Sequence, residues 1–116
     1  ARSMPMMIGF AEQRRMMLEA EFVRFVEELP SLGVERVYVT GDFGEQLVRS
    51  DTLLEVVIVH STEEPWRRRA DFFVDHLRPR VETRFHVYTS EEFAELAEVD
   101  PLLIRARGIG APAYGG

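Results

Sequence analysis

The spacing of apolar residues in the first half of the chain predicts one long helix followed by two strands. From residue 10 to residue 29 apolar side chains recur every three or four positions, which places them along one face of a helix. Pro30 and Gly33 interrupt this spacing. Residues 34–40 then form a run rich in Val and Tyr, which is typical of a strand. Residues 53–59 are almost uniformly apolar and are therefore expected to form a central strand.

Two capping signals organise the second half. Hydroxyl and carboxylate side chains at residues 61–64 predict a helix start, and the apolar positions from 66 to 77 share one helical face. After a third expected strand at residues 81–88, Thr89 and Glu92 have the spacing of a capping box. A last helix is expected to begin after Asp100, with Pro101 at its first position, and to end at Gly108.

These elements predict a single small domain. The order is typical of an α/β or α+β fold with a mixed sheet of three or more strands and flanking helices. We expect residues 1–9 to be an N-terminal extension, in which Ala-Arg-Ser is a candidate remnant of a tag, and residues 10–110 to form the domain. Residues 111–116 are expected to be a flexible tail, because they carry no pattern that would order them alone.

Composition narrows the classes of function. The 116 residues carry a net charge of −6, which disfavours a broad electrostatic contact with nucleic acid. Cysteine is absent, so thiolate metal sites and cysteine nucleophiles are excluded, and no apolar stretch is long enough to span a membrane. We therefore expect a cytoplasmic protein. Every basic residue is Arg, and the absence of Asn and Cys weakly suggests a thermophile.

Three segments carry a resemblance to a known family. Residues 37–45 read VYVTGDFGE, residues 50–59 read SDTLLEVVIV, and residues 87–93 read VYTSEEF. Together they resemble the DNA polymerase β-like nucleotidyltransferase superfamily, and in particular its minimal nucleotidyltransferases, over about residues 18–110. The resemblance implies a nucleotidyltransferase fold in which Gly41, Asp42 and Gly44 form the nucleotide-binding turn. It also implies that Asp51 is the first catalytic carboxylate, which binds Mg²⁺ if the protein is active.

The same resemblance predicts a degenerate site. Asp42 stands where the family has a serine, and its negative charge would repel a triphosphate. Leu53 occupies the position of the second carboxylate, and Arg84 that of the third. Only Asp51 of the three metal ligands is retained, so we expect no cofactor. Asp51 is expected to be a relic that caps or orders the loop, with metal binding or a partner contact as the alternatives. Asp42 is expected to be a turn residue that bonds its own backbone, with a role as a ligand as the alternative.

Glu55 and Arg84 suggest what replaces the metal. Glu55 is expected to share a face with Asp51 but to lie too far along the strand to join it at one metal ion. We therefore predict that Arg84 forms an ion pair with Glu55 or Asp51 across the sheet. His60, His76 and His86 are too scattered to form a metal or acid–base set and are expected to be packing or surface residues.

Several functions remain open at this point. The first is a non-catalytic domain that acts by protein association, either as a homo-oligomer or as the antitoxin-like partner of a HEPN-type helical protein, as the resemblance implies. The second is an active enzyme that transfers an NMP group, AMP in particular, from a nucleoside triphosphate to a protein or small acceptor. The third is a nucleotide-sensing domain. The loss of ligands favours the first, and the fold alone does not decide between them.

Overall fold

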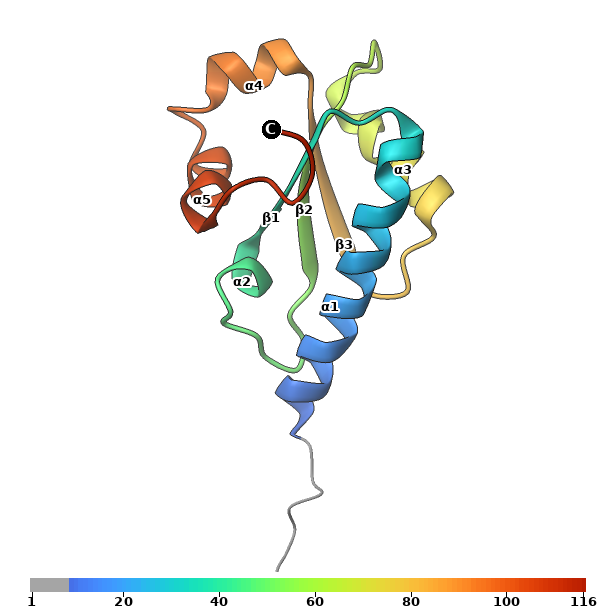
Figure 1. The fold of residues 1–116 in the computed structure, drawn as a ribbon, viewed down its shortest axis with the longest axis vertical. Helices are drawn as coiled ribbons and strands as arrows, with labels where there is room; N and C mark the ends of the chain where they lie inside the picture. The colour runs from blue at the N-terminus through green and yellow to red at the C-terminus, as the bar shows by residue number, and fades with distance from the viewer. Residues whose placement is uncertain (1–8) are drawn as a thin grey trace, which may run out of the picture.

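The computed structural model describes residues 9–116 and shows a three-stranded sheet flanked by helices (Figure 1). The prediction of a small mixed sheet with flanking helices is therefore confirmed. The elements in chain order are α1 (Phe10–Glu28), η1 (Leu29–Leu32), β1 (Arg36–Thr40), α2 (Gly41–Gly44), β2 (Leu54–Val59), η2 (Trp66–Arg68), α3 (Arg69–Leu77), β3 (Thr83–Tyr88), α4 (Ser90–Leu96) and α5 (Pro101–Ile109).

β2 is the central strand, as its apolar sequence predicts. It pairs antiparallel with β1 and parallel with β3. The register places Glu55 of β2 opposite Thr40 on one side and Arg84 on the other. Side chains alternate between the two faces of a sheet, so these three residues belong to the same face.

The helices cover the two faces of the sheet separately. One face packs against α1 and α3, where Leu18, Phe25 and Phe73 are buried in a common core with strand residues such as Val56. The opposite face packs against α4 and α5, in a second core that contains Tyr38, Val57, Val59, Tyr88, Phe93, Ala97, Leu103 and Ala106. Thr40, Glu55 and Arg84 lie at one end of this face and are not part of the second core. Polar side chains therefore gather at this end of the sheet.

The start of the third helical segment differs from the prediction. Residues 61–64 are not helical, and the helical turn begins at Trp66. Pro65 disfavours helical backbone in the residue before it. The Thr62 hydroxyl instead accepts a hydrogen bond from the Glu64 N–H group at 3.1 Å, within the loop. The Thr89–Glu92 capping box and the Asp100 cap are both formed as predicted.

The C-terminal residues cross the edge of β1, which the sequence did not predict. The Val37 N–H group donates to the Tyr114 carbonyl at 3.1 Å, and the Ala113 N–H group donates to the Val37 carbonyl at 2.7 Å. The Tyr114 side chain packs against the core beneath α1. Residues 111–116 therefore connect α5 on one side of the sheet with the core on the other (Figure 1). The proposed tag remnant lies outside the described residues.

The longest helix, α1, has 19 residues, and its exposed side carries both ion pairs and apolar side chains. Arg15 forms ion pairs there with Glu12 and Glu19. Among residues 9–116, no helix combines the length and the apolar character that crossing a bilayer requires.

Candidate functional site

Gly41 begins the short helix α2, directly after β1. Its φ of 75° lies in the left-handed region, which side chains disfavour. A Cβ atom at this position would lie 2.5 Å from Oε2 of Glu55. Glycine at position 41 is therefore explained by the turn and by the close approach of Glu55, without any nucleotide.

Gly44 allows α2 to approach α5. A Cβ atom on Gly44 would lie 2.9 Å from Cδ1 of Ile109. The second glycine of the loop thus serves contact between two helices, and Gly41, Asp42 and Gly44 all lie within one four-residue helix.

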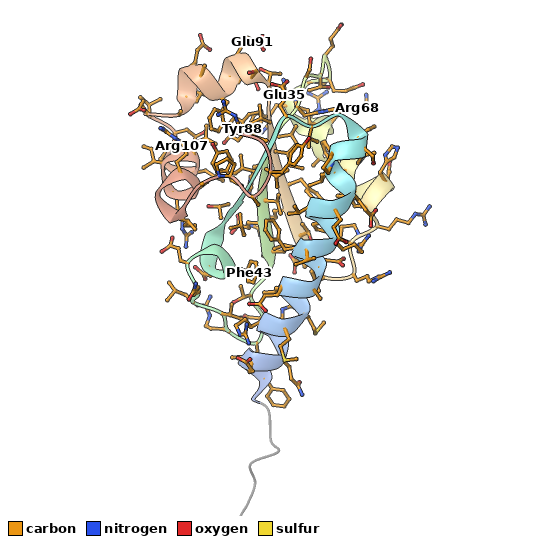
Figure 2. All side chains as sticks on the ribbon, in the orientation of Figure 1. Glu35, Phe43, Arg68, Tyr88, Glu91 and Arg107 are labelled. Atoms are coloured by element: carbon orange, nitrogen blue, oxygen red, sulfur yellow. The ribbon has the colours of Figure 1, made fainter. Side chains whose placement is uncertain are left out.

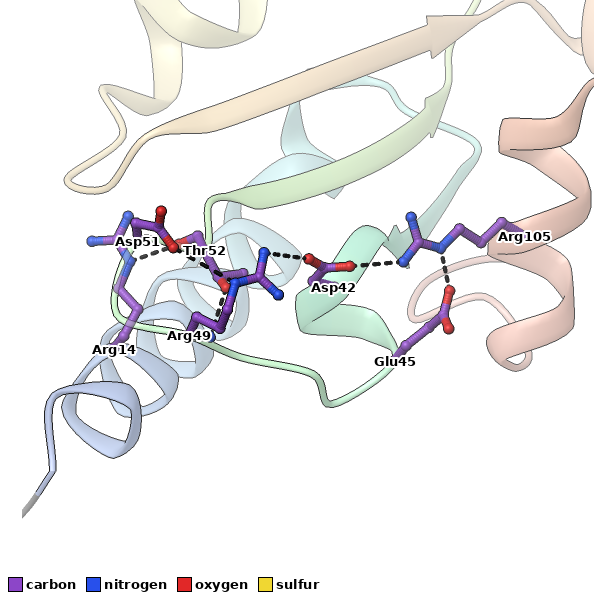
Figure 3. Close-up of polar contacts among 7 residues, drawn as sticks. All are labelled: Arg14, Asp42, Glu45, Arg49, Asp51, Thr52 and Arg105. Carbon is purple, nitrogen blue, oxygen red and sulfur yellow. Dashed lines mark hydrogen bonds and ion pairs between the residues drawn. The ribbon is translucent and has the colours of Figure 1, made fainter.

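Asp42 is held between two arginines (Figure 3). Its Oδ1 accepts a hydrogen bond from Nη2 of Arg105 at 3.0 Å, and its Oδ2 accepts one from Nη2 of Arg49 at 3.0 Å. Arg105 also forms an ion pair with Glu45. The Arg105 guanidinium, and then that of Arg49, hold the pKa of Asp42 below its usual range. Each carboxylate oxygen of Asp42 therefore has a cationic partner, in place of the backbone bond expected of a turn residue.

Asp51 is exposed and lies in a turn before β2. Its side chain is 87% exposed, and Oδ1 is 3.9 Å from Nε of Arg49. The neighbouring Thr52 orders the loop instead, because its hydroxyl accepts from the Arg49 N–H group at 2.8 Å and its carbonyl accepts from Nε of Arg14 at 2.7 Å (Figure 3). A loop-ordering role was expected for Asp51, and the structure gives it to Thr52.

Glu55 pairs with His86, and the predicted ion pair with Arg84 is not formed. Oε1 of Glu55 lies 3.0 Å from Nε2 of His86, and both side chains are about a fifth exposed. Within residues 9–116, Arg84 makes no ion pair, although the register places it opposite Glu55. Arg84 is exposed, so its charge is solvated by water rather than by a carboxylate.

A shallow cleft joins these groups but does not fit a pair of metal ions. It has a volume of about 250 Å³, and its lining residues are Asp42, Arg49, Asp51, Thr52, Leu53, Glu55 and Arg105. Asp51, Leu53 and Glu55 thus line one cavity. In the described part of the chain, no three His, Asp or Glu side chains are grouped closely enough to hold a metal ion. The oxygen ligands that Mg²⁺ requires are therefore not assembled.

The most important partners at this site were missed in the sequence. Arg49, Thr52, His86 and Arg105 carry most of its polar contacts. Arg105 and Asp42 are separated by 63 positions, so no local spacing links them. Only the packing of α5 beside α2 brings this pair together.

No protein-family model, curated protein or solved structure matches this chain. The nucleotidyltransferase resemblance consequently rests on the three sequence segments quoted above. Membership of that superfamily stays a prediction.

Proposed function

We propose that this chain is a nucleotidyltransferase-like domain that has lost catalysis and acts by association with another protein. The observation that carries the proposal is the position of Asp42 between Arg49 and Arg105. In the resemblance, this corner of the site receives the triphosphate. Here it contains a carboxylate whose two oxygens are both paired with guanidinium groups.

The electrostatics of the cleft support this proposal. A triphosphate would have to displace Asp42 from Arg49 and Arg105 before it could use those cations. It would then lie beside the negatively charged carboxylate of Asp42, which would no longer be paired with either arginine. Leu53 supplies no oxygen ligand that would bring a divalent cation to screen this repulsion.

The small volume of the cleft also supports the proposed loss of nucleotide-dependent catalysis. Its volume of about 250 Å³ is below the range of roughly 300–1,000 Å³ that is usual for small-molecule sites. Glu55, the remaining carboxylate on the adjoining strand, is engaged with His86.

Apolar side chains on the solvent side of α1 favour a protein partner. Met16 and Val23 are 50% and 56% exposed and, with the intervening Ala20, follow the spacing of one helical face. Such a stripe is suited to another helix, which agrees with the helical or self-association partner that the resemblance implies.

The direct test combines binding with chemistry. We expect calorimetry with MgATP to show no saturable binding at millimolar nucleotide, and labelled ATP to transfer no label to the protein or to an added helical partner. Metal-dependent labelling that Asp51→Ala abolishes would overturn the proposal in favour of an active transferase.

A nucleotide sensor is the second candidate, because two guanidinium groups do line the cleft. Arg49 and Arg105 are 67% and 41% exposed, and Arg side chains match phosphate geometry well. This candidate requires saturable nucleotide binding that is weakened by both Arg49→Ala and Arg105→Ala, without transfer of label.

A further inference from the structure

A second cavity lies at the other end of the sheet face that carries Glu55. It is lined by residues of β1, β2 and α5 and by residues in and directly after α4. Its volume is about 350 Å³, within the range of roughly 300–1,000 Å³ that is usual for small-molecule sites. It shares no lining residue with the cleft beside Asp42, so the two are separate sites.

The lining of this cavity is positively charged, although the chain has a net charge of −6. Two guanidinium groups line it, from Arg36 and Arg107, and none of the described carboxylates does. The cleft beside Asp42 differs, because three carboxylates line it. The acidic residues of α4 lie elsewhere, and Glu91, for example, is on the outer side of the helix (Figure 2). The cavity therefore favours an anionic ligand.

Arg36 is the guanidinium that is available to pair with such an anion. It is half-buried at the first position of β1, and its Cζ atom lies 5.4 Å from the centre of the Phe93 ring. Among residues 9–116 its side chain forms no ion pair and donates no hydrogen bond. The N–H groups of this guanidinium consequently have no acceptor in that part of the chain. A carboxylate can accept hydrogen bonds from two of them at once.

Arg107 adds a second guanidinium, which is already partly neutralised. It extends from α5 toward the end of α4, where its Nη1 donates to the Ala97 carbonyl at 2.9 Å (Figure 2). The same atom lies 3.2 Å from Oε2 of Glu98, which is 82% exposed, so this ion pair is weak. One unpaired and one paired guanidinium suit a ligand with a single negative charge better than a dianion.

The remaining lining suits an apolar group. Val59, Phe93, Ala94 and Ala97 supply apolar side chains, and the two alanines leave space that longer side chains would occupy. The Phe93 ring is held in place by Tyr38, with the two ring centres 5.6 Å apart. Burial of an apolar group against these residues would add to the attraction of the guanidinium for the anion.

We propose that this cavity binds a small organic monocarboxylate, with the carboxylate on Arg36 and a compact apolar group against Phe93. Arg107 provides a further N–H donor at the same cavity. A phosphate monoester is the poorer fit, because it carries a charge of about −1.5 to −2 at neutral pH and meets only one unpaired guanidinium. This site goes beyond the proposed function and does not depend on it.

The test is an NMR titration of the full chain with four small probes. Phenylacetate carries a carboxylate and a ring, phenylacetamide is its neutral counterpart, acetate lacks the ring, and phenyl phosphate has a more highly charged head. We expect millimolar phenylacetate to cause saturable shifts of the amide signals of Arg36, Tyr38 and Ala94. Phenylacetamide should bind about tenfold or more weakly, because its pairing with Arg36 is not charge-assisted on both sides. Acetate should also bind about tenfold or more weakly, because it buries no ring.

Three variants of the protein locate the site. Arg36→Gln removes the guanidinium and is expected to weaken phenylacetate binding about tenfold. Ala94→Leu keeps Arg36 and fills the cavity from an exposed helix position, and it is expected to weaken binding by a similar factor. Leucine is a good helix former, so this variant should fold like the wild type. Arg67→Gln is the matched control, because Arg67 is exposed in η2 and does not line the cavity. It is expected to leave binding unchanged.

Four results would each overturn this inference. They are no saturable shift with phenylacetate, equal affinity for phenylacetate and phenylacetamide, equal affinity of Arg36→Gln and Arg67→Gln for phenylacetate, and tighter binding of phenyl phosphate than of phenylacetate. The last result would assign the cavity to a phosphate monoester instead. None of these results bears on the proposed function, which the experiments with ATP test separately.

Discussion

Replacement of Gly41 by alanine separates a structural role for this glycine from a role in nucleotide binding. The φ of 75° at Gly41 is unfavourable for alanine by about 1–2 kcal/mol. The new methyl group would also lie 2.5 Å from Oε2 of Glu55, so the carboxylate must move. Its displacement disrupts the hydrogen bond to His86, at a cost of about 1 kcal/mol. We expect Gly41→Ala to lower the free energy of unfolding by about 2–3 kcal/mol in total.

Urea denaturation followed by circular dichroism measures this decrease in the free energy of unfolding. A double-mutant cycle with Glu55 shows how much of the decrease comes from overlap with the carboxylate. In the Glu55→Ala background the overlap with the new methyl group is absent, so the cost of Gly41→Ala should fall by about 1 kcal/mol. Gly108→Ala is the matched control, because Gly108 lies in α5 and an added Cβ atom would meet no atom within 4 Å. This control is expected to stabilise the protein by about 0.5–1 kcal/mol.

Two results would refute this reasoning. If Gly41→Ala unfolds within about 0.5 kcal/mol of the wild type, the backbone at residue 41 does not require glycine. If Gly41→Ala lowers the free energy of unfolding by the same amount with and without the Glu55 side chain, overlap with this carboxylate does not contribute to the loss of stability.

Three further predictions concern the ion pairs. Arg69→Met should lower the free energy of unfolding by about 2 kcal/mol in urea denaturation, because Arg69 is 10% exposed and its loss leaves Glu92 without its partner; an unchanged midpoint would contradict this. The arginine partners of Glu21 and Glu92 lower the pKa of both carboxyl groups, so their contribution to stability is complete above about pH 4.5 and is lost as the pH falls through the folded-state pKa values. Glu21→Gln should therefore flatten the acid limb of stability against pH, and an unaltered limb would be the contrary result. Arg105→Ala should raise the pKa of Asp42 toward the ordinary value in an NMR titration, whereas an unaltered pKa would mean that the pair is not formed in solution.

Local patterns in the sequence predicted the sheet and most of the helices, because each depends on neighbouring residues. The apolar run of β2 correctly indicated a central strand, and the Thr89–Glu92 pair correctly indicated a helix start. The start expected at residues 61–64 was wrong, since Pro65 disfavours helical backbone before it. The hydroxyl and carboxylate side chains of residues 61–64 favour a helix start, but the steric restriction from the proline prevails over them.

The polar contacts of the candidate site were less predictable, because they depend on tertiary packing. An ion pair of Arg84 with Glu55 or Asp51 was predicted. Arg84 does lie opposite Glu55 on the neighbouring strand, yet the carboxylate pairs with His86, which lies two residues farther along the same face. Similarly, the charge at Asp42 was visible in the sequence, but its partner Arg105 comes from a helix that only the fold brings near.

The contact of the C-terminal residues with β1 had no sequence signal for a related reason. Ala113 contributes only its backbone N–H group and Tyr114 its carbonyl, and Gly and Ala dominate the flanking positions. Pairing of this kind depends on an available strand edge, which a local pattern does not reveal.

An NMR titration of the full chain with MgATP tests the central claim, the loss of nucleotide-dependent chemistry, most directly. The amide signals of residues 41–51 report on the whole loop, including Asp42 and Asp51. We predict that millimolar MgATP produces no saturable shift of these signals. Arg49 and Arg105 are already paired with Asp42, and Leu53 provides no ligand for a metal ion. Saturable shifts of residues 41–51 that disappear in Asp51→Ala would contradict the account.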